Sequence, residues 1–307
     1  MTKPPLKNIA VSVHQRLLNL SRERKEDFNH ILTKYTLERF LYRLSSSEFS
    51  NSFLLKGAML FEIWFNKPYR PTKDIDVLGF IANDIADIEK VFKLLCNLVV
   101  EDDGLIFLAN TVKGQEIREA KKYQGIRITL TAKLGKATIP TQIDIGFGDA
   151  VTPAAELTEF PTLLDFPAPI LRVYPKYTVV AEKFEAMTSL GITNSRMKDF
   201  YDIWILMQTL DFQGSILSQA LKATFEQRKT KLPNSKAPLA LTSAFAEDYS
   251  KQKQWQGFIK KNRLEAHESL AEIIIQLREF LMPPTFAAAE EREFLQIWQL
   301  AGPWQSD

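Results

Sequence analysis

Residues 73–80 read KDIDVLGF, and this stretch decides how the rest of the chain is interpreted. Its aspartates alternate with apolar residues, as in a β-strand, where successive side chains point to opposite faces. Asp74 and Asp76 therefore share one face, and Ile75 and Val77 share the other. Two neighbouring carboxylates repel each other and are costly to bury without a cation. A divalent metal resolves that conflict, and Mg²⁺ takes oxygen ligands while keeping positions for phosphate oxygens.

A third carboxylate, Asp144, lies in residues 142–145, QIDI, on a second predicted strand. A turn at residues 134–136 joins this strand to the alternating segment 126–131, which predicts a hairpin. If the Asp144 strand neighbours residues 73–80, the three carboxylates converge on one edge of a sheet. That arrangement suits two-metal phosphoryl or nucleotidyl transfer. Asp149 is a rival third carboxylate, but it follows Gly-Phe-Gly and is predicted to lie in the following turn.

A glycine step precedes the two aspartates. Residues 54–60, LLKGAML, place Gly57 between an apolar strand and an apolar helix, 17 positions before Asp74. Backbone amides at such a helix start can hold phosphate, and glycine allows close approach. A single glycine more often has a packing role, so its value lies in its position before the aspartates.

The remaining pattern predicts an α+β fold, a small mixed sheet with flanking helices followed by a mostly helical half. Two domains are expected, residues 1–150 and 151–307. Predicted helices cover residues 8–20, 24–46, 83–97, 176–190, 196–210, 214–228, 240–248 and 263–281. Predicted strands include residues 104–108, 115–131 and 141–145, and the proline-rich segment 151–175 is interpreted as a long connector.

Composition limits the classes of protein. The chain has 307 residues, 45% of them hydrophobic, and 39 basic against 37 acidic residues, so net charge indicates neither a nucleic acid nor a membrane partner. Its single cysteine, Cys96, is expected to be a small buried side chain. No signal-peptide pattern is present, and no run approaches the roughly 20 apolar residues of a membrane span. We expect a reduced, soluble, cytoplasmic protein.

The helical half contains one unusual lysine. On a helix over residues 176–190, Lys183 has only apolar neighbours three and four positions away, so it projects from the packing face and needs an anion. The alternative is a lysine at the rim of the core whose ammonium reaches solvent. Asp199 and Asp202 flank the apolar stripe of the next predicted helix. They could hold Lys183, accept a proton from an attacking hydroxyl, or cap the helix.

Four elements in this order resemble the AbiEii/AbiGii toxin family of nucleotidyltransferases. They are LKGA at 55–58, RPTKDID at 70–76, AEK at 181–183 and RMKDFYD at 196–202. The resemblance covers residues 50–210, and the C-terminal third adds no motif. The wider superfamily has Gly-Gly or Gly-Ser at the glycine step, whereas this chain has Ala58 in second place. A serine hydroxyl for the triphosphate is thus missing, which leaves backbone contacts from this turn.

The resemblance implies an NTP donor, Mg²⁺ (with Mn²⁺ as the alternative) at Asp74 and Asp76, and contact between Lys183 and the donor phosphates. It also implies an essential aspartate, placed at Asp199 with Asp202 as the alternative. The residues expected to contact the nucleotide are Lys56, Gly57, Ala58, Arg70, Thr72 and Asp202. Relatives are toxins of bacterial toxin–antitoxin or phage-defence pairs, and some modify the acceptor end of tRNA. An antitoxin protein and an RNA acceptor are therefore the expected partners.

The expected mechanism follows from charge. Lys183, with Arg70, would neutralise the phosphates, and Asp144 would assist a second metal or act as a base. For RNA, Arg196, Lys198 and residues 228–231, RKTK, would supply backbone contacts, although the last run is interpreted first as a solvated helix end. The alternatives are a small hydroxylated acceptor, such as an antibiotic, and a catalytically silent binding module. The hypothesis requires Lys183 and the three carboxylates to line one cleft.

Overall fold

The protein is described by a computed structural model covering residues 8–65, 72–119, 123–264 and 268–306. It divides into two compact units. Unit 1 consists of Met1–Gly148 and Glu156–Val173, and unit 2 consists of Asp149–Ala155 and Tyr174–Asp307. The expected roles of domains 1–150 and 151–307 stay predictions.

Unit 1 is a sheet with helices against it. In chain order its elements are α1 (Ile9–Arg24), α2 (Phe28–Ser45), η1 (Ser50–Ser52), β1 (Phe53–Lys56), η2 (Gly57–Met59), α3 (Leu60–Phe65), β2 (Asp74–Gly79), α4 (Ile85–Cys96), β3 (Leu105–Glu119), β4 (Tyr123–Leu134), β5 (Ala137–Phe147), β6 (Glu156–Glu159) and β7 (Ile170–Val173).

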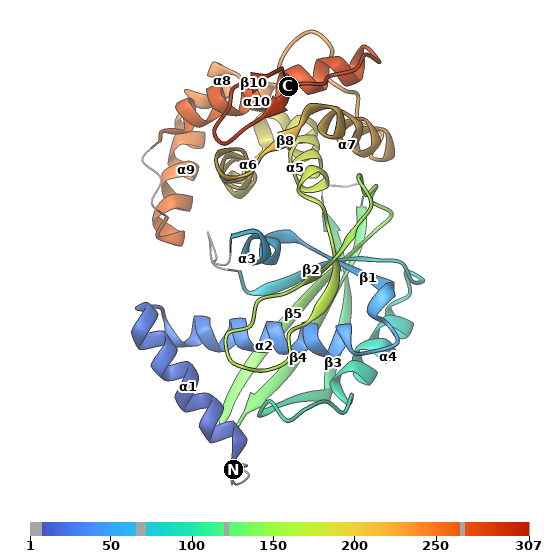
Figure 1. Ribbon diagram of the computed structural model, residues 1–307, viewed down its shortest axis with the longest axis vertical. Helices are drawn as coiled ribbons and strands as arrows, with labels where there is room; N and C mark the ends of the chain where they lie inside the picture. Colours follow the sequence, from blue (N-terminus) through green and yellow to red (C-terminus); the bar gives the residue numbers. More distant parts are fainter. Residues whose placement is uncertain (1–7, 66–71, 120–122, 265–267, 307) are drawn as a thin grey trace. The chain divides into compact units, whose positions relative to one another are not determined.

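The seven strands lie in the order β3-β4-β5-β2-β1-β7-β6 (Figure 1). Strand β2 is parallel to β5 and antiparallel to β1, while β1 is parallel to β7, so the sheet is mixed. Strands β4 and β5 form the hairpin that the alternation at residues 126–131 and 141–145 predicts. The predicted fold class, a mixed sheet with flanking helices followed by helices, is confirmed.

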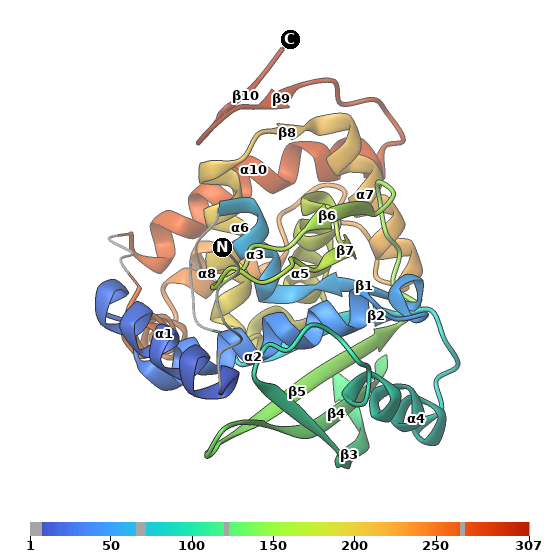
Figure 2. The ribbon, with the colours of Figure 1, turned by 60° about the horizontal axis from the view of Figure 1, so that its bottom comes forward.

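One face of this sheet forms the core of unit 1. Helices α2 and α4 pack against it (Figure 2). An aromatic cluster joins the layers. Phe40 of α2 stacks on Phe92 of α4 at 5.8 Å between ring centroids, and it meets Phe107 of β3 edge-on at 5.2 Å. Along β2, Ile75 and Val77 are each 1% exposed, whereas Asp74 and Asp76 are half-buried. The alternation therefore turns the aspartates away from the buried apolar side chains.

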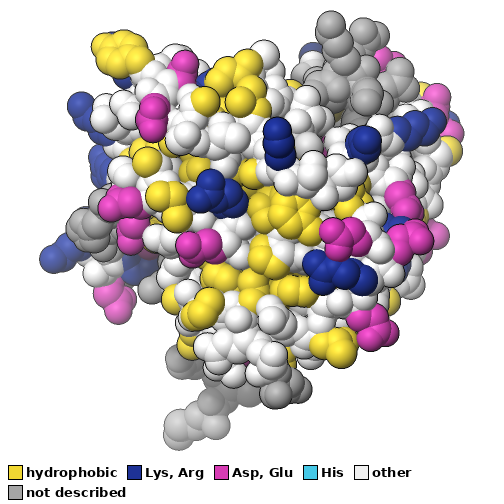
Figure 3. All heavy atoms as spheres, turned by 90° about the horizontal axis from the view of Figure 1, so that it is seen from above, with side chains coloured by type: hydrophobic (Ala, Val, Ile, Leu, Met, Phe, Trp, Pro, Cys, Tyr) yellow, Lys and Arg dark blue, Asp and Glu magenta, His cyan; other side chains and the backbone are white. Residues whose placement is uncertain are grey.

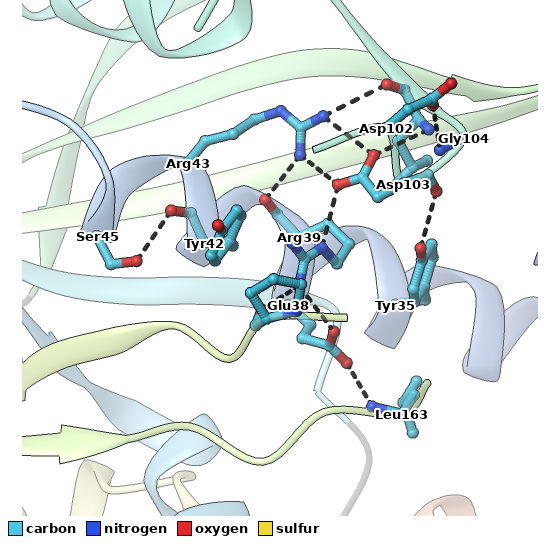
Figure 4. Close-up of polar contacts among 12 residues, drawn as sticks. Tyr35, Glu38, Arg39, Tyr42, Arg43, Ser45, Asp102, Asp103, Gly104 and Leu163 are labelled. Atoms are coloured by element: carbon cyan, nitrogen blue, oxygen red, sulfur yellow. Dashed lines mark hydrogen bonds and ion pairs between the residues drawn. The ribbon is translucent and has the colours of Figure 1, made fainter. Parts of the chain in front are cut away.

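Helix α2 carries a buried network of charges (Figure 4). The Asp103 carboxylate accepts hydrogen bonds from Nε of Arg39 at 3.1 Å and from Arg43 at 2.7 Å, and the Asp103 carbonyl accepts one from the Tyr35 hydroxyl at 2.8 Å. Glu38 accepts a hydrogen bond from the Leu163 amide at 2.7 Å. Burial raises the pKa of Glu38 to about 7. These contacts tie α2 to the two loops that contain Asp103 and Leu163.

Two sequence predictions in unit 1 are wrong in detail. The predicted strand 115–131 belongs to two strands, because β3 extends to Glu119 and β4 begins at Tyr123. The predicted connector 151–175 contains β6 and β7, which extend the sheet beyond β1. Arg70, an expected nucleotide contact, lies outside the described residues.

Unit 2 is mostly helical. Its elements are α5 (Lys176–Leu190), η3 (Gly191–Thr193), α6 (Met197–Thr209), β8 (Phe212–Gln213), α7 (Gly214–Gln227), η4 (Leu239–Leu241), α8 (Ser243–Ala246), α9 (Tyr249–Asn262), α10 (Leu270–Ala289), β9 (Ile297–Trp298) and β10 (Trp304–Gln305).

Helices α5, α6 and α7 match the predicted segments 176–190, 196–210 and 214–228. The prediction for the last part of the chain is less accurate. Helix α9 was not predicted, α10 begins at Leu270 rather than at 263, and β8, β9 and β10 form a small antiparallel sheet. Aromatic side chains pack against that sheet, and Phe280 of α10 stacks on Trp304 of β10 at 5.7 Å between ring centroids.

Some hydrophobic side chains stay at the surface. Figure 3 shows one face on which they gather, bordered by basic and acidic side chains. Within unit 2, Ile275, Leu295 and Leu300 are 48%, 69% and 62% exposed. Among the described residues, no helix has the length and apolar character that crossing a bilayer requires.

Candidate active site

Four charged side chains form a row across the polar face of the sheet. Asp76 on β2 pairs with Asp144 on β5, and Asp76 also pairs with Lys56 on β1. Asp144 in turn pairs with Arg127 on β4. Paired residues in a sheet project to the same face. The row therefore reads Lys56, Asp76, Asp144, Arg127, with two carboxylates between two cations.

Asp74 completes a cluster of three carboxylates. One oxygen from each of Asp74, Asp76 and Asp144 lies within 4.8 Å of the others. The Thr72 hydroxyl donates a hydrogen bond to Oδ1 of Asp74 at 2.8 Å and fixes its orientation. The cluster lies on the central strands β2 and β5 rather than at an edge of the sheet. Half-buried, closely spaced carboxylate oxygens are the donor set that Mg²⁺ and Mn²⁺ accept, so these residues fit a divalent ion.

Gly57 lies directly against this cluster. Its φ is +77°, a conformation that favours glycine, and a Cβ built there would lie 2.0 Å from Oδ2 of Asp76. The turn from β1 into η2 therefore brings the backbone and the carboxylate together only because residue 57 has no side chain. Ala58, the next residue, is 8% exposed, and its methyl group belongs to the core.

Arg127 is a site residue that the sequence interpretation missed. Its Nε and Nη2 donate to the two oxygens of Asp144 at 2.8 and 2.7 Å, which makes a bidentate ion pair. The hydrogen bond to Asp144 and the nearby charges of Asp74 and Asp76 raise the pKa of Arg127. The two-residue turn of the hairpin was the sequence feature from which this contact could have been predicted. A turn at residues 135–136 pairs 134 with 137, and the same register pairs 127 with 144.

A second cluster lies in unit 2 and centres on Lys183 of α5. Its ammonium contacts Asp199 at 2.8 Å and Asp202 at 2.9 Å, both on α6. The lysine side chain is 13% exposed, and the two aspartates are almost completely buried, at 0% and 1%. The anion that Lys183 needs is thus supplied by the pair of aspartates. The two aspartates could hold Lys183, accept a proton or cap the helix, and their direct contacts with the ammonium support the first of these roles.

Asp199 has a second cationic partner. Nε of Arg196 lies 2.7 Å from Oδ2 of Asp199, which makes an ion pair. Burial by itself raises the pKa of Asp199, but the charges of Lys183 and Arg196 outweigh it, so the pKa lies below its ordinary value. Asp199 is therefore an ionised, buried carboxylate between two cations.

Residues 228–231 do not form a uniformly solvated basic run. Arg228 lies 2.9 Å from Asp149, 3.3 Å from Glu182 and 3.0 Å from Glu185, and its side chain is 13% exposed. Burial alone would lower its pKa, yet Glu182 and Asp149 raise it overall. Lys229 and Lys231 are exposed. The structure thus assigns both Arg228 and Asp149 to a buried ion-pair cluster of unit 2, outside the group of three carboxylates.

The predicted site residues consequently form two groups. Lys56, Gly57, Ala58, Thr72, Asp74, Asp76 and Asp144 belong to unit 1, and Lys183, Asp199 and Asp202 belong to unit 2. Each unit brings its own charged residues into contact or close proximity. The single cleft that would join the groups stays a prediction.

Comparison with known proteins gives the enzyme class. The sequence profile of a nucleotidyl transferase family matches residues 39–291, which include all the site residues above. The protein is therefore a nucleotidyltransferase. It belongs to the AbiEii family, the nucleotidyl transferase toxins of type IV toxin–antitoxin systems. Membership of this family implies an NTP substrate and an antitoxin partner.

Solved structures and curated proteins add less. JHP933 from Helicobacter pylori is 14% identical, with a TM-score of 0.47 over 83% of this chain and 91% of that chain. Another Helicobacter pylori crystal structure, named as a nucleotidyltransferase candidate, is 14% identical, with a TM-score of 0.47 over 83% of this chain and 94% of that chain. No curated protein matches the chain.

Proposed function

We propose that this protein transfers a nucleoside monophosphate from an Mg²⁺-bound NTP to a hydroxyl group of RNA, with the acceptor end of tRNA as the preferred target, and that this activity makes it the toxin of its pair. The observation that carries the proposal is the group of three carboxylates beside the Gly57 turn. The arrangement occurs in a chain that belongs to a nucleotidyl transferase toxin family.

The unit 1 residues would bind the metal and the triphosphate. A divalent ion bound there supplies charge stabilisation for the phosphate oxygens. Asp74 and Asp76 would hold it, Thr72 orients Asp74, and Gly57 leaves room for the Asp76 carboxylate because it has no side chain. Mn²⁺ would serve in place of Mg²⁺, since the ligands are all oxygen.

Lys183 would act on the same NTP. Asp199 and Asp202 fix its ammonium, and Asp199 is itself held by Arg196. In the reaction, the acceptor oxygen bonds to the α-phosphorus, the bond from that phosphorus to the bridging oxygen breaks, and pyrophosphate leaves. The hydroxyl proton passes to a carboxylate of the cluster. Lys183 neutralises charge on the departing pyrophosphate. The two aspartates are thus positioning residues for the lysine.

Support for an RNA acceptor comes from the family and from charge. Lys198, Lys229 and Lys231 are exposed on unit 2 and could contact a phosphate backbone. The test is transfer of ³²P from each of four α-labelled NTPs to total RNA, to purified tRNA or to small hydroxylated compounds. We expect label in tRNA, dependent on Mg²⁺ or Mn²⁺ and absent with Asp76→Asn. Label confined to the small compounds would replace the RNA acceptor with an antibiotic-type one. Absence of label from every acceptor would favour a silent binding module.

The toxin role has its own test. Wild type and Asp76→Asn are expressed in bacteria without an antitoxin, and growth is followed. We expect only the wild type to stop growth. If both strains grow equally while label transfer persists in vitro, the protein is an enzyme without toxicity in that host.

A further inference from the structure

Helix α9 of unit 2 is rich in positive charge (Figure 1). Residues 249–263 contain five basic side chains and no acidic one. Those that are exposed are Lys253, Lys260, Lys261 and Arg263. None of these four forms an ion pair with a described residue. A positive surface that carries no carboxylate of its own attracts a polyanion.

The inner face of α9 is fixed by its contacts, and this defines the direction of the basic side chains. Trp255 and Phe258 pack against Tyr201 of α6, with ring centroids 6.4 and 5.8 Å away. Lys253 and Lys260 lie on the opposite side of the helix from these two aromatic residues. The exposed lysines therefore form a stripe that faces solvent.

Two uncharged residues of the same stripe suit a nucleic acid. Gly257 is exposed in the middle of the helix, and among the described atoms nothing outside the helix backbone lies within 4 Å of a Cβ built there. Glycine weakens a helix relative to alanine, so its value here is the close approach that it allows. Tyr249 is 70% exposed, and Nζ of Lys253 lies 4.4 Å from its ring centroid. A nucleobase can stack on such a ring.

The helix is anchored to the segment that holds the Lys183 cluster. The Lys251 ammonium points inward and donates to the Asn194 carbonyl at 2.9 Å. The Asn194 side-chain oxygen accepts a hydrogen bond from the Arg196 amide at 2.8 Å, and Arg196 forms the ion pair with Asp199. A ligand bound to α9 is therefore held by a helix that is tied directly to the turn beside Lys183.

We propose that the exposed face of α9 binds the phosphate backbone of the acceptor RNA, with one base stacked on Tyr249. This face, called the α9 face below, consists of Tyr249, Lys253, Gly257, Lys260, Lys261 and Arg263. The inference rests on the RNA acceptor of the proposed function and adds the surface that binds it. RNA fits this face better than an acidic protein, because Tyr249 is the only large hydrophobic side chain exposed among the described residues of α9, whereas protein interfaces have an apolar centre.

The test measures binding of fluorescently labelled tRNA to the full chain by anisotropy, without NTP and over a range of salt concentrations. Lys253→Gln/Lys260→Gln should bind about tenfold more weakly at about 0.1 M salt and reduce the slope of log affinity against log salt concentration by about 1 to 2, the loss of two phosphate contacts. Tyr249→Ala should weaken binding about fivefold without changing that slope, because stacking releases no counterions. Gly257→Gln should raise the melting temperature, since glutamine is the better helix former, while weakening RNA binding.

The matched control is Lys133→Gln/Lys136→Gln, which removes two exposed positive charges from the β4–β5 hairpin of unit 1 and should bind tRNA as the wild type does. In label transfer, the effect of Lys253→Gln/Lys260→Gln should appear mainly in the KM for tRNA. Equal weakening in the two double variants would overturn the inference, as would competition by polyglutamate that matches competition by unlabelled RNA at equal charge.

The inference and the proposed function fail in different ways. If the wild type labels tRNA, and the α9 variants bind and label it equally well, the α9 face is not the RNA surface and the proposed function stands. If the wild type labels only small hydroxylated compounds and does not bind tRNA, the RNA acceptor fails, and the inference fails with it.

Discussion

The carboxylate of Asp76 occupies the space that a side chain at residue 57 would need. A Cβ on Gly57 would lie 2.0 Å from Oδ2 and 2.7 Å from Cβ of Asp76. Because the second of these atoms is close to the β2 backbone, rotation of the aspartate side chain cannot relieve the overlap completely. Gly57 is therefore part of the site because the absence of a side chain leaves room for the Asp76 carboxylate.

Gly57→Ala should displace Asp76 and weaken Mn²⁺ binding by at least about tenfold, since a metal site tolerates little misplacement of its ligands. The matched control is Gly135→Ala. Gly135 also has a positive φ, +58°, but nothing lies within 4 Å of a Cβ there. Both variants should lose about 1 kcal/mol of stability through the backbone conformation, and Gly57→Ala should lose more because its Cβ overlaps Asp76. Calorimetric titration with Mn²⁺ checks the difference, and equal affinity in the two variants would contradict it.

Asp199→Asn should destabilise unit 2 by about 3 kcal/mol at pH 7, because it removes the buried negative charge that Lys183 and Arg196 both contact and leaves Asp202 as the carboxylate beside Lys183. The pKa of Asp199 is lowered in the folded state, so its contribution is present above the unfolded value of 3.8 and is lost as pH falls below it. The difference from wild type should stay constant from pH 8 to pH 5 and shrink below about 4.

Urea unfolding followed by tryptophan fluorescence measures this change, because four of the five tryptophans, at positions 204, 255, 298 and 304, lie in unit 2. The exposed Asp211 provides the control, and Asp211→Asn should change stability by less than about 0.5 kcal/mol. A similar loss in both variants would show that the Lys183 cluster contributes nothing particular.

The free energy of unfolding of Glu38→Gln should increase relative to that of the wild type as pH rises. Burial raises the pKa of Glu38 to about 7 from an ordinary 4.5, so the folded protein binds a proton that the unfolded chain releases between these values. Wild-type stability should therefore fall relative to the variant from pH 4.5 to 7 and level off above, by on the order of 3 kcal/mol. Hydrogen exchange of the α2 amides, corrected for intrinsic rates, measures it. A difference that is independent of pH would refute the assignment.

Arg228→Met should cost about 3 to 5 kcal/mol, since Asp149, Glu182 and Glu185 would lose their shared cation. Lys231→Met, which removes the same charge three residues later from an exposed position, should change stability by less than about 0.5 kcal/mol. Thermal unfolding of the two variants distinguishes a structural arginine from a solvated basic run. Equal melting temperatures would restore the sequence interpretation of residues 228–231.

The proximity of the three carboxylates was predictable because it depends on short-range patterns. Alternation in residues 74–77 and 141–145 fixes which face the carboxylates occupy, and one strand pairing then brings them together. The bond from Arg127 to Asp144 required one further step, since the hairpin register follows from the length of its turn. That Asp199 and Asp202 contact Lys183 depends on how α5 packs against α6, which helical periodicity alone does not specify.

The missed elements share a physical cause. Strands β6 and β7 have four residues each, and they join the sheet because β7 pairs with β1, far away in sequence, and β6 pairs with β7, so no local period marks them. Helix α9 is mostly polar, with only Lys251 and Trp255 buried, and therefore lacks the wide apolar stripe that indicates a helix. In both cases, tertiary contacts determine a secondary structure that the local sequence does not specify.

Segments of the two units alternate along the chain, and this order has a consequence for folding during synthesis. The sheet of unit 1 remains incomplete on the ribosome until residue 173 has emerged, because β6 and β7 are its last two strands. Before then, residues 149–155 have already been made, and they belong to unit 2. Until the later strands arrive, β1 is an edge that can pair with another nascent chain. The two units therefore cannot fold strictly one after the other. A break in the polypeptide at residue 150 would leave unit 1 without β6 and β7, two strands of its sheet.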